Sequence, residues 1–151
     1  MADTSDSWPE LSVVVPVLNE ADNIAPLVRE IAAALETRIA FEIVYIDDGS
    51  SDGTRSLYPT LKERWPGEDI QVKLQEINKG KGAALREGFK LATGDIILIQ
   101  DADLEYNPED YHRLLEPILA DKADVVYGSR YRGGAAHRVD RFWHTLGNKF
   151  V

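Results

Sequence analysis

Cysteine is absent from the chain of 151 residues, which excludes a disulfide framework and a metal site built on thiolates. This absence fits the reducing cytoplasm, where we expect the protein to act. The first ten residues, MADTSDSWPE, lack the basic and apolar regions of a signal peptide. No apolar run approaches the ~20 residues that span a bilayer, and no repeat or low-complexity tract is present. The length is sufficient for one domain with a sizeable core.

Positive charge is scarce. The chain has 17 Lys and Arg against 26 Asp and Glu, and its net charge of -9 argues against nucleic acid as a partner. Residues 1–127 carry 12 basic and 25 acidic residues, a net charge of -13, whereas residues 128–151 carry five and one, a net charge of +4. The basic end is compatible with a local fluctuation in composition, and equally with a site for phosphate or a membrane surface.

Apolar runs and helical repeats alternate along the chain. Near-continuous apolar runs predict buried strands over 11–17, 41–46, 95–100 and 123–129, and the alternating run 71–77 predicts a strand nearer a sheet edge. Helices are predicted between them: over 24–35 after a cap at Asp22, from Ser51 or Asp52 through Trp65, from NKGKG through Ala92 with Gly94 as a C-cap signal, and from Pro108 through Leu119.

This alternation predicts an α/β fold, a Rossmann-like, doubly wound and mostly parallel sheet with helices on both faces. Ligands of such sheets bind outside the carboxyl ends of the strands. The segments that follow the predicted strands are PVLNE, DDGSSDGT, NKGKG, DADLE and GSRYRGG. A functional site is therefore expected among them.

Carboxylates stand out in two of these segments. Asp48, with Asp47 beside it, could accept hydrogen bonds from a ribose hydroxyl or a base N–H, or the pair could serve an Asx turn and a helix cap. Asp101, Asp103 and Glu105 stand at every second position, so an extended backbone would point them the same way. A divalent cation such as Mg²⁺ or Mn²⁺ would relieve their repulsion. A solvated acidic turn is the alternative.

Basic residues stand out in the other segments. NKGKG carries two lysines and two glycines at a predicted helix N-terminus, where anions are attracted, although a plain strand-to-helix turn explains Lys79 as well. The third glycine of a dinucleotide fingerprint is replaced by Leu85, which disfavours a Rossmann oxidoreductase. Arg130 could hold a phosphate or be an ordinary exposed arginine. His112, His137 and His144 show no metal spacing, and no nucleophile elbow is present.

Four segments, SVVVPVLNEADNI, VYIDDGSSDGT, NKGKGAALREGFKLATGDIILIQDADLEYNP and VVYGSRY, occur in order over residues 12–131. Together they resemble family 2 glycosyltransferases of the GT-A fold, most closely the polyprenyl- or dolichyl-phosphate mannosyl- and glucosyltransferases. The family often has Tyr at the position of Leu18 and Gln or Ser at that of Glu105. By this resemblance, Leu18 would leave the nucleotide base without an aromatic surface, and Glu105 would add a charge to the implied metal site.

The resemblance implies a role for each matching residue. Pro16, Leu18, Glu20, Ile46 and Asp48 would line the nucleotide base pocket, with Asp47 alongside. Asp101 and Ala102 would lie against the sugar nucleotide, Asp103 and Glu105 would bind Mg²⁺ or Mn²⁺, and Arg130, helped by Lys81, would hold phosphate. The catalytic residues are then expected to be Asp101, Asp103 and Arg130.

The implied domain plan has three parts. Residues 1–10 would be a disordered or loosely attached N-terminus, residues 11–131 a nucleotide-sugar-binding GT-A core, and residues 132–151 the start of a truncated acceptor or membrane-proximal region. Phe142, Trp143, Leu146 and Phe150 fall at helical spacing in the last part, beside basic residues. The segment 138–151 is expected to lie at the cytoplasmic face of a membrane, to be a core helix without its neighbours, or to form a homodimer interface.

The implied reaction is a metal-dependent, inverting transfer of a hexose, mannose or glucose, from a GDP- or UDP-sugar to a polyprenyl phosphate. Such an acceptor is already an anionic nucleophile, so no general base is required, in line with the lack of a catalytic histidine signature. The alternative is a catalytically incomplete nucleotide-sugar-binding domain that needs a partner or a C-terminal lobe.

Overall fold

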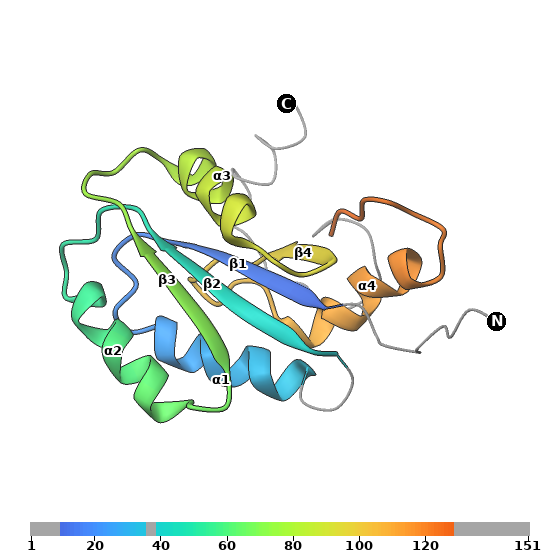
Figure 1. Cartoon of the computed structure of the whole chain (residues 1–151), viewed down its shortest axis with the longest axis horizontal. Helices are drawn as coiled ribbons and strands as arrows, with labels where there is room; N and C mark the ends of the chain where they lie inside the picture. Colours follow the sequence, from blue (N-terminus) through green and yellow to red (C-terminus); the bar gives the residue numbers. More distant parts are fainter. Residues whose placement is uncertain (1–9, 36–38, 129–151) are drawn as a thin grey trace, which may run out of the picture. The chain divides into compact units, whose positions relative to one another are not determined.

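The computed structural model describes residues 10–35 and 39–128 (Figure 1). In chain order the elements are β1 (Leu11–Val17), α1 (Ile24–Leu35), β2 (Phe41–Asp47), α2 (Thr54–Arg64), β3 (Asp69–Leu74), α3 (Lys81–Leu91), β4 (Ile96–Ile99), the 3-10 turn η1 (Pro108–Asp110) and α4 (Tyr111–Leu119). The predicted alternation of strands and helices is confirmed as far as α4.

The four strands form one parallel sheet in the order β3-β2-β1-β4. The order places β1 at the centre, with β2 on one side and β4 on the other. In Figure 1, α1 and α2 lie on one face of the sheet and α3 on the opposite face. Successive strands are added on one side of β1 up to β3 and on its other side from β4, so the strand order reverses at β1. Sheets of α/β proteins bind ligands in the crevice at the carboxyl end of such a switch point.

Each face of the sheet buries its own set of side chains. Val14, Val44 and Ile46 pack against Ala84 of α3. Tyr45, one residue from both Val44 and Ile46, points the other way, where its hydroxyl donates to the Ile24 carbonyl of α1 at 3.0 Å. Strand residues alternate between faces, so a sheet covered on both sides reads as a continuous apolar run. The predicted apolar face of α1 is confirmed, because Ile24, Leu27, Val28, Ile31, Ala32 and Leu35 are buried.

Two glycines allow elements to approach closely. A Cβ on Gly88 of α3 would lie 2.3 Å from Val14 Cγ1, so this glycine sets the distance between the helix and the sheet. We expected Gly94 to be a helix C-cap, but α3 ends with Ala92 as its cap. Gly94 instead lies against β1, where its N–H donates to Ser12 Oγ at 2.8 Å and a Cβ would lie 2.7 Å from the Glu10 carbonyl oxygen.

Two predicted strands differ from the structure. Residues 123–128 form no strand, and both Val125 and Tyr127 are exposed, so the prediction for this part of 123–129 is wrong. An apolar run forms a strand only if a partner strand pairs with its backbone. β4 pairs with β1 alone within the described residues, and its Ile97 and Ile99 are exposed rather than buried. β3, at the other end of the sheet, is the edge strand that its alternation predicted.

The chain divides into two compact units, residues 1–111 and 112–151. The first contains the sheet, α1 to α3 and η1, and the second contains α4 from His112 onward. None of the helices in the described ranges combines the length and the apolar composition needed to cross a membrane. The phosphate contact at Arg130, the region 132–151 and the amphipathic segment 138–151 lie outside the described residues.

Candidate functional site

A cleft of about 270 Å³ opens at the carboxyl ends of β1, β2 and β4, next to the start of α3. It lies within the first compact unit. Its walls come from the four segments that follow strands β1 to β4. The lining residues are Pro16, Val17, Leu18, Glu20, Asp48, Asn78, Gly80, Lys81, Ala84, Asp101, Ala102 and Asp103.

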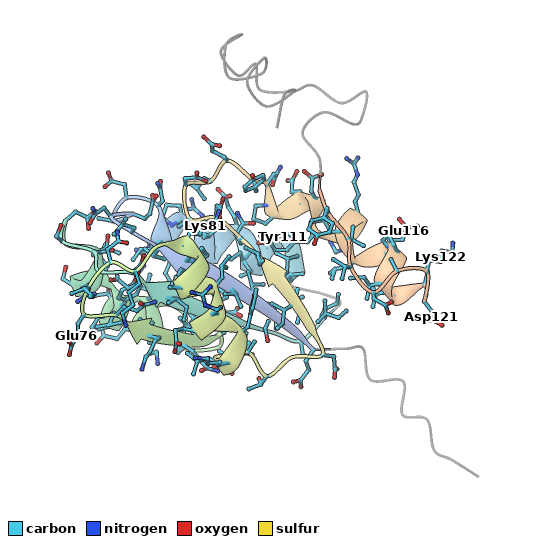
Figure 2. The ribbon with its side chains drawn as sticks, turned by 90° about the horizontal axis from the view of Figure 1, so that it is seen from above. Glu76, Lys81, Tyr111, Glu116, Asp121 and Lys122 are labelled. Atoms are coloured by element: carbon cyan, nitrogen blue, oxygen red, sulfur yellow. The ribbon has the colours of Figure 1, made fainter. Side chains whose placement is uncertain are left out.

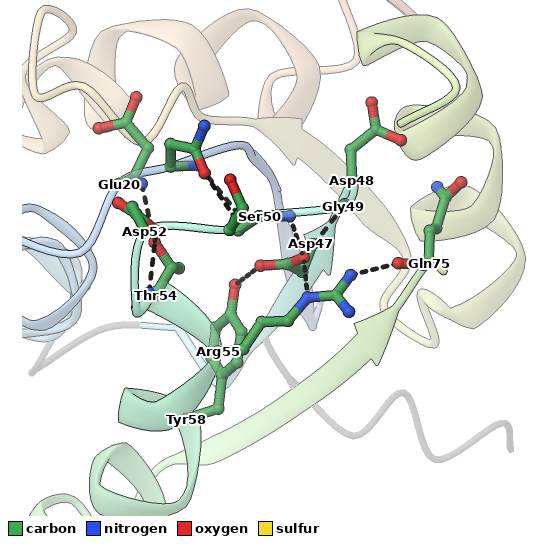
Figure 3. Close-up of polar contacts among 12 residues, drawn as sticks. Glu20, Asp47, Asp48, Gly49, Ser50, Asp52, Thr54, Arg55, Tyr58 and Gln75 are labelled. Carbon is green, nitrogen blue, oxygen red and sulfur yellow. Dashed lines mark hydrogen bonds and ion pairs between the residues drawn. The ribbon is translucent and has the colours of Figure 1, made fainter. Parts of the chain in front are cut away.

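Asp47 and Asp48 lie on opposite sides of the sheet. Asp48 points to the α3 side and lines the cleft, whereas Asp47 points toward α2 and is fully buried (Figure 3). Asp47, which we expected alongside Asp48 in the nucleotide pocket, does not line the cleft, because adjacent residues at the end of a strand face opposite ways. Of the two carboxylates, only Asp48 lines the cleft.

The Asp47 carboxylate organises the turn that follows β2. Oδ1 accepts from Gly49 N at 3.2 Å, Ser50 N at 2.9 Å and Arg55 Nε at 2.8 Å, and Oδ2 accepts from the Tyr58 hydroxyl at 3.1 Å. Burial raises the pKa of Asp47, but the hydrogen bonds from Ser50, Arg55 and Tyr58 outweigh it and leave the pKa below its usual value. Asp47 is thus a buried, ionised Asx-turn acceptor.

The PVLNE segment is locked to the turn after β2. Asn19 adopts a positive φ of 57°. Its backbone N–H donates to Ser50 Oγ at 2.9 Å, and its side-chain oxygen accepts from Ser51 N at 2.8 Å. Next to it, Glu20 N donates to Thr54 Oγ1 at 2.9 Å. These bonds fix the backbone on which Leu18 and Glu20 enter the cleft, a role for Asn19 that the sequence did not suggest.

Lys81 and Asp101 form an ion pair across the cleft. The Lys81 Nζ lies 2.5 Å from Asp101 Oδ1, which joins the start of α3 to the end of β4. Figure 2 shows Lys81 at this end of the helix. Gly80, the N-cap of α3, has φ of 88° and provides no side-chain cap. The Gly80 N–H itself donates to Asp48 Oδ2 at 2.7 Å, so the Asp48 carboxylate lies at the α3 N-terminus, which attracts anions.

Asp101, Asp103 and Glu105 do not converge. Leu104 has φ of 60°, so residues 101–105 turn instead of extending, and the Glu105 N–H donates to Asp103 Oδ1 at 3.0 Å. The expected extended conformation is wrong, because a left-handed residue breaks the two-residue alternation. Asp101 and Asp103 line the cleft and Glu105 does not. In the described part of the chain, no three His, Cys, Asp or Glu side chains are placed to hold a metal ion.

Most of the residues expected at the site lie around this cleft. Pro16, Leu18, Glu20, Asp48, Lys81, Asp101, Ala102 and Asp103 line it, whereas Ile46 is buried beneath it in the α3 packing cluster. Sequence reasoning missed four lining residues: Val17, Asn78, Gly80 and Ala84. Asn78 and Gly80 belong to the NKGKG segment, so the signal was present in the sequence, but it was assigned to the lysines.

A sequence model of the family described as "Glycosyl transferase family 2" matches residues 12–146, which covers all four segments of the cleft. The chain belongs to glycosyl transferase family 2. This membership and the parallel sheet with helices on both faces agree with the GT-A fold expected from the sequence.

The chain also resembles curated sugar transferases named for polyprenyl-phosphate reactions. An undecaprenyl-phosphate 4-deoxy-4-formamido-L-arabinose transferase of Sodalis glossinidius is 39% identical over 118 residues, which are 78% of this chain and 36% of that protein. A dolichol-phosphate mannosyltransferase of Pyrococcus furiosus is 36% identical over 126 residues, which are 83% of this chain and 34% of that protein. The chain thus spans little more than a third of the length of these relatives.

Solved structures show the same fold. A mannosyltransferase from Pyrobaculum calidifontis, in complex with GDP-Man and Mn²⁺, superposes with a TM-score of 0.63 at 31% identity over 70% of this chain and 30% of that one. A glucosyl-3-phosphoglycerate synthase from Mycobacterium tuberculosis, in complex with Mn²⁺ and UDP-Glc, superposes with a TM-score of 0.58 at 26% identity over 74% of this chain and 39% of that one.

Proposed function

We propose that this chain binds the donor substrate of a glycosyltransferase, a GDP- or UDP-hexose carrying mannose or glucose, together with Mg²⁺ or Mn²⁺. The observation that carries the proposal is the cleft at the switch point of the sheet. Carboxylates, a lysine and a helix N-terminus meet there. Similar structures hold GDP-Man or UDP-Glc with Mn²⁺, which supports this class of ligand.

The base of the nucleotide would lie over Pro16 and Leu18, with the Asp48 carboxylate as an acceptor for its N–H groups. Leu18 has 42% of its surface exposed in the cleft, so it offers an apolar contact for the base in place of an aromatic ring. The diphosphate would then reach the α3 N-terminus and Lys81. Both attract negative charge, and Lys81 would then share its charge between Asp101 and the diphosphate.

The residues of the cleft fit a divalent cation whose ligands come partly from the protein and partly from the phosphates of the substrate. Asp103 would contribute a hard carboxylate oxygen, and Mg²⁺ is typically held by one or two carboxylates plus substrate phosphates. Glu105, which we also expected as a ligand, does not line the cleft in this conformation. When bound, the ion would neutralise charge on the diphosphate leaving group. Arg130, outside the described residues, is proposed as a second contact to phosphate.

We further propose transfer of the hexose, with inversion, to a polyprenyl phosphate. Two of the relatives are named for an undecaprenyl-phosphate and a dolichol-phosphate reaction. An acceptor phosphate is an anion at neutral pH and can attack without a general base. This fits the cleft, whose lining among residues 10–35 and 39–128 contains no histidine. A lipid acceptor would place the chain at a membrane surface, on its cytoplasmic side, where 138–151 would contact lipid or a second copy.

Calorimetric titration of GDP and UDP, each with and without Mn²⁺, tests donor binding. We expect Asp103→Ala to weaken metal-dependent binding about 10- to 100-fold, the usual cost of disturbing a metal site. Asp69→Ala removes a carboxylate at the opposite, amino end of β3 and should bind as the wild type does. Failure of the wild-type chain to bind either nucleotide, or an undiminished affinity of Asp103→Ala, would contradict the proposal.

The second candidate is a nucleotide-sugar-binding domain that does not turn over alone. This candidate is kept because the match covers 34% of the length of one curated relative and 43% of that of another, so the activity of those whole proteins is not carried over to this chain. Incubation of the chain with radiolabelled GDP-mannose or UDP-glucose and a polyprenyl phosphate separates the two candidates. Label in the lipid fraction would establish transfer, and binding without labelled lipid would favour the incomplete domain.

A further inference from the structure

We propose that Arg55 is a positioning residue for the nucleotide site, although it does not line the cleft. Through Asp47 and the Gln75 carbonyl it holds together the two segments between which Asp48 is placed. The inference rests on the proposed function, since it concerns how the donor nucleotide is received. Arg55 lies in the first turn of α2, beyond the DDGSSDGT segment, and no feature of the sequence suggested a role for it.

Asp48 is held from two directions. Its own N–H donates to the Val17 carbonyl at 2.8 Å, which fixes its backbone against β1. Its two carboxylate oxygens accept from Lys79 N at 2.8 Å and from Gly80 N at 2.7 Å. The direction of this carboxylate therefore depends on where residues 75–80 lie relative to the turn after β2.

Arg55 bridges the anchor points of both segments (Figure 3). Its Nε donates to Asp47 Oδ1, the same oxygen that accepts from Gly49 and Ser50 in the turn. Its Nη2 donates to the Gln75 carbonyl oxygen, at the start of the segment 75–80 that contacts Asp48. The Asp47 carbonyl completes the loop by accepting from Gln75 N at 2.9 Å. A planar guanidinium can make both contacts at once, whereas an ammonium ion cannot hold that geometry.

The Gln75 side chain does not explain why this residue stays in place. Both polar atoms of its amide are buried and make no hydrogen bond within the described residues. The backbone bonds to Asp47 and Arg55 therefore fix the residue. Loss of Arg55 removes one of these bonds and leaves the Asp47 carboxylate without its cation. We expect the segment 75–80 to become less well placed, and with it the Asp48 carboxylate.

The test is a calorimetric titration of GDP and UDP, with Mn²⁺, into wild type, Arg55→Met and Arg55→Lys. We expect Arg55→Met to bind the preferred nucleotide about tenfold more weakly, as for other residues that orient a ligand group. Arg55→Lys should regain the ion pair with Asp47 but lose the second contact. Its melting temperature should therefore be close to that of the wild type while its affinity stays several-fold lower.

A purely structural role predicts a different result. Glu42→Gln disturbs another buried carboxylate, at the amino end of β2 and far from the cleft, and provides the control for lost stability. It should lower the melting temperature without changing nucleotide affinity at a temperature well below the transition. Wild-type affinity in Arg55→Lys, and in Arg55→Met if it folds, would overturn the inference and leave the proposed function intact. No binding by the wild type would overturn both.

Discussion

Gly49 is the residue at which the two segments around Asp48 come closest together. It has φ of 90°, and a Cβ placed on it would lie 2.7 Å from the backbone nitrogen of Asn78 and 3.0 Å from the carbonyl carbon of Ile77. Neither neighbour is the flexible end of a side chain, so neither can move cheaply. The turn after β2 and the segment before α3 can touch only because this position has no side chain.

We predict that Gly49→Ala destabilises the protein and weakens nucleotide binding. The positive φ costs about 1–2 kcal/mol for alanine, and the overlap with backbone adds about 1–3 kcal/mol. Gly53→Ala is the matched control, because Gly53 has φ of 104° but nothing lies within 4 Å of its Cβ position. Gly53→Ala should therefore cost only about 1–2 kcal/mol, the part that comes from the positive φ. Urea unfolding and GDP or UDP titration would measure both effects, and equal losses in the two variants would contradict the prediction.

At single residues, the sequence is a better guide to which side chains meet than to how they point. The alternation of side chains along a strand predicts that Asp47 and Asp48 face opposite ways. Because both stand at the end of an apolar run, we nevertheless predicted that they lie in one site. The turn at Leu104 has no comparable signal, since leucine rarely adopts a positive φ. Arg55 could not be found either, because its partners lie 8 and 20 residues away along the chain.

Among the elements, the amino ends of the strands are joined by a network around Glu42. Its Oε1 accepts from Ser12 Oγ at 2.6 Å and from Thr93 N at 2.6 Å, and its Oε2 accepts from Gln71 Nε2 at 2.6 Å. One carboxylate thus links β1, β2, β3 and the connection from α3 to β4. Glu42 also lines a cavity of about 120 Å³. Its bonds are made within the protein, so we assign the network to stability.

We predict that this network makes the protein less stable in acid. Burial raises the pKa of Glu42, but the bonds from Ser12, Thr93 and Gln71 outweigh it, and the folded-state pKa lies below the usual 4.5. A pKa that is lower in the folded state contributes stability above the unfolded value and loses it as the pH falls through the folded value. Wild type should therefore lose stability below about pH 4.5 partly through Glu42.

Glu42→Gln provides the measurement. At pH 7 the amide can keep its one carbonyl oxygen on Ser12 and Thr93, but its NH2 group then faces Gln71 Nε2. The loss of this bond and of the negative charge that strengthens the others should cost about 1–3 kcal/mol in the free energy of unfolding. Urea unfolding of wild type and variant between pH 7 and pH 3 should show the gap narrowing on acidification. Asp47, whose pKa is also lowered, stays in both proteins and cancels in the comparison. The prediction is contradicted if the difference in unfolding free energy between wild type and variant stays constant with pH, because Glu42 would then titrate alike in the folded and unfolded states.

Element types were easier to predict than their surroundings. Near-continuous apolar runs identified β1 and β2, and helical apolar spacing identified α1, because both faces of the sheet are covered there. The same kind of run in 95–100 gave a strand with exposed Ile97 and Ile99, and in 123–128 gave none. An apolar run indicates that its side chains are buried in the folded protein. It does not indicate which segment packs over them or which strand pairs with the backbone.

For the molecule as a whole, the described residues of the cleft do not by themselves form a full set of metal ligands. The described residues bring no three acidic or histidine side chains together, and Asp101 is already paired with Lys81 at 2.5 Å. A cation at Asp103 would therefore depend on oxygen atoms from the diphosphate. Metal and nucleotide should each bind weakly alone and strongly together, which makes their binding energetically coupled.

We predict that this coupling appears in the melting temperature of the whole chain. A ligand that binds only the folded state at a concentration 100 times its Kd stabilises it by about 2.7 kcal/mol, which for a domain of this size raises the melting temperature by several degrees. Mn²⁺ alone, or GDP or UDP alone, should give little of this shift, and the preferred nucleotide with Mn²⁺ should give it in full. EDTA should abolish the combined shift, and Asp103→Ala should reduce it to the level of nucleotide alone.

The prediction is contradicted if Mn²⁺ alone raises the melting temperature as much as Mn²⁺ and nucleotide together. In that case the protein would bind the metal fully without the diphosphate, through residues other than those described around the cleft.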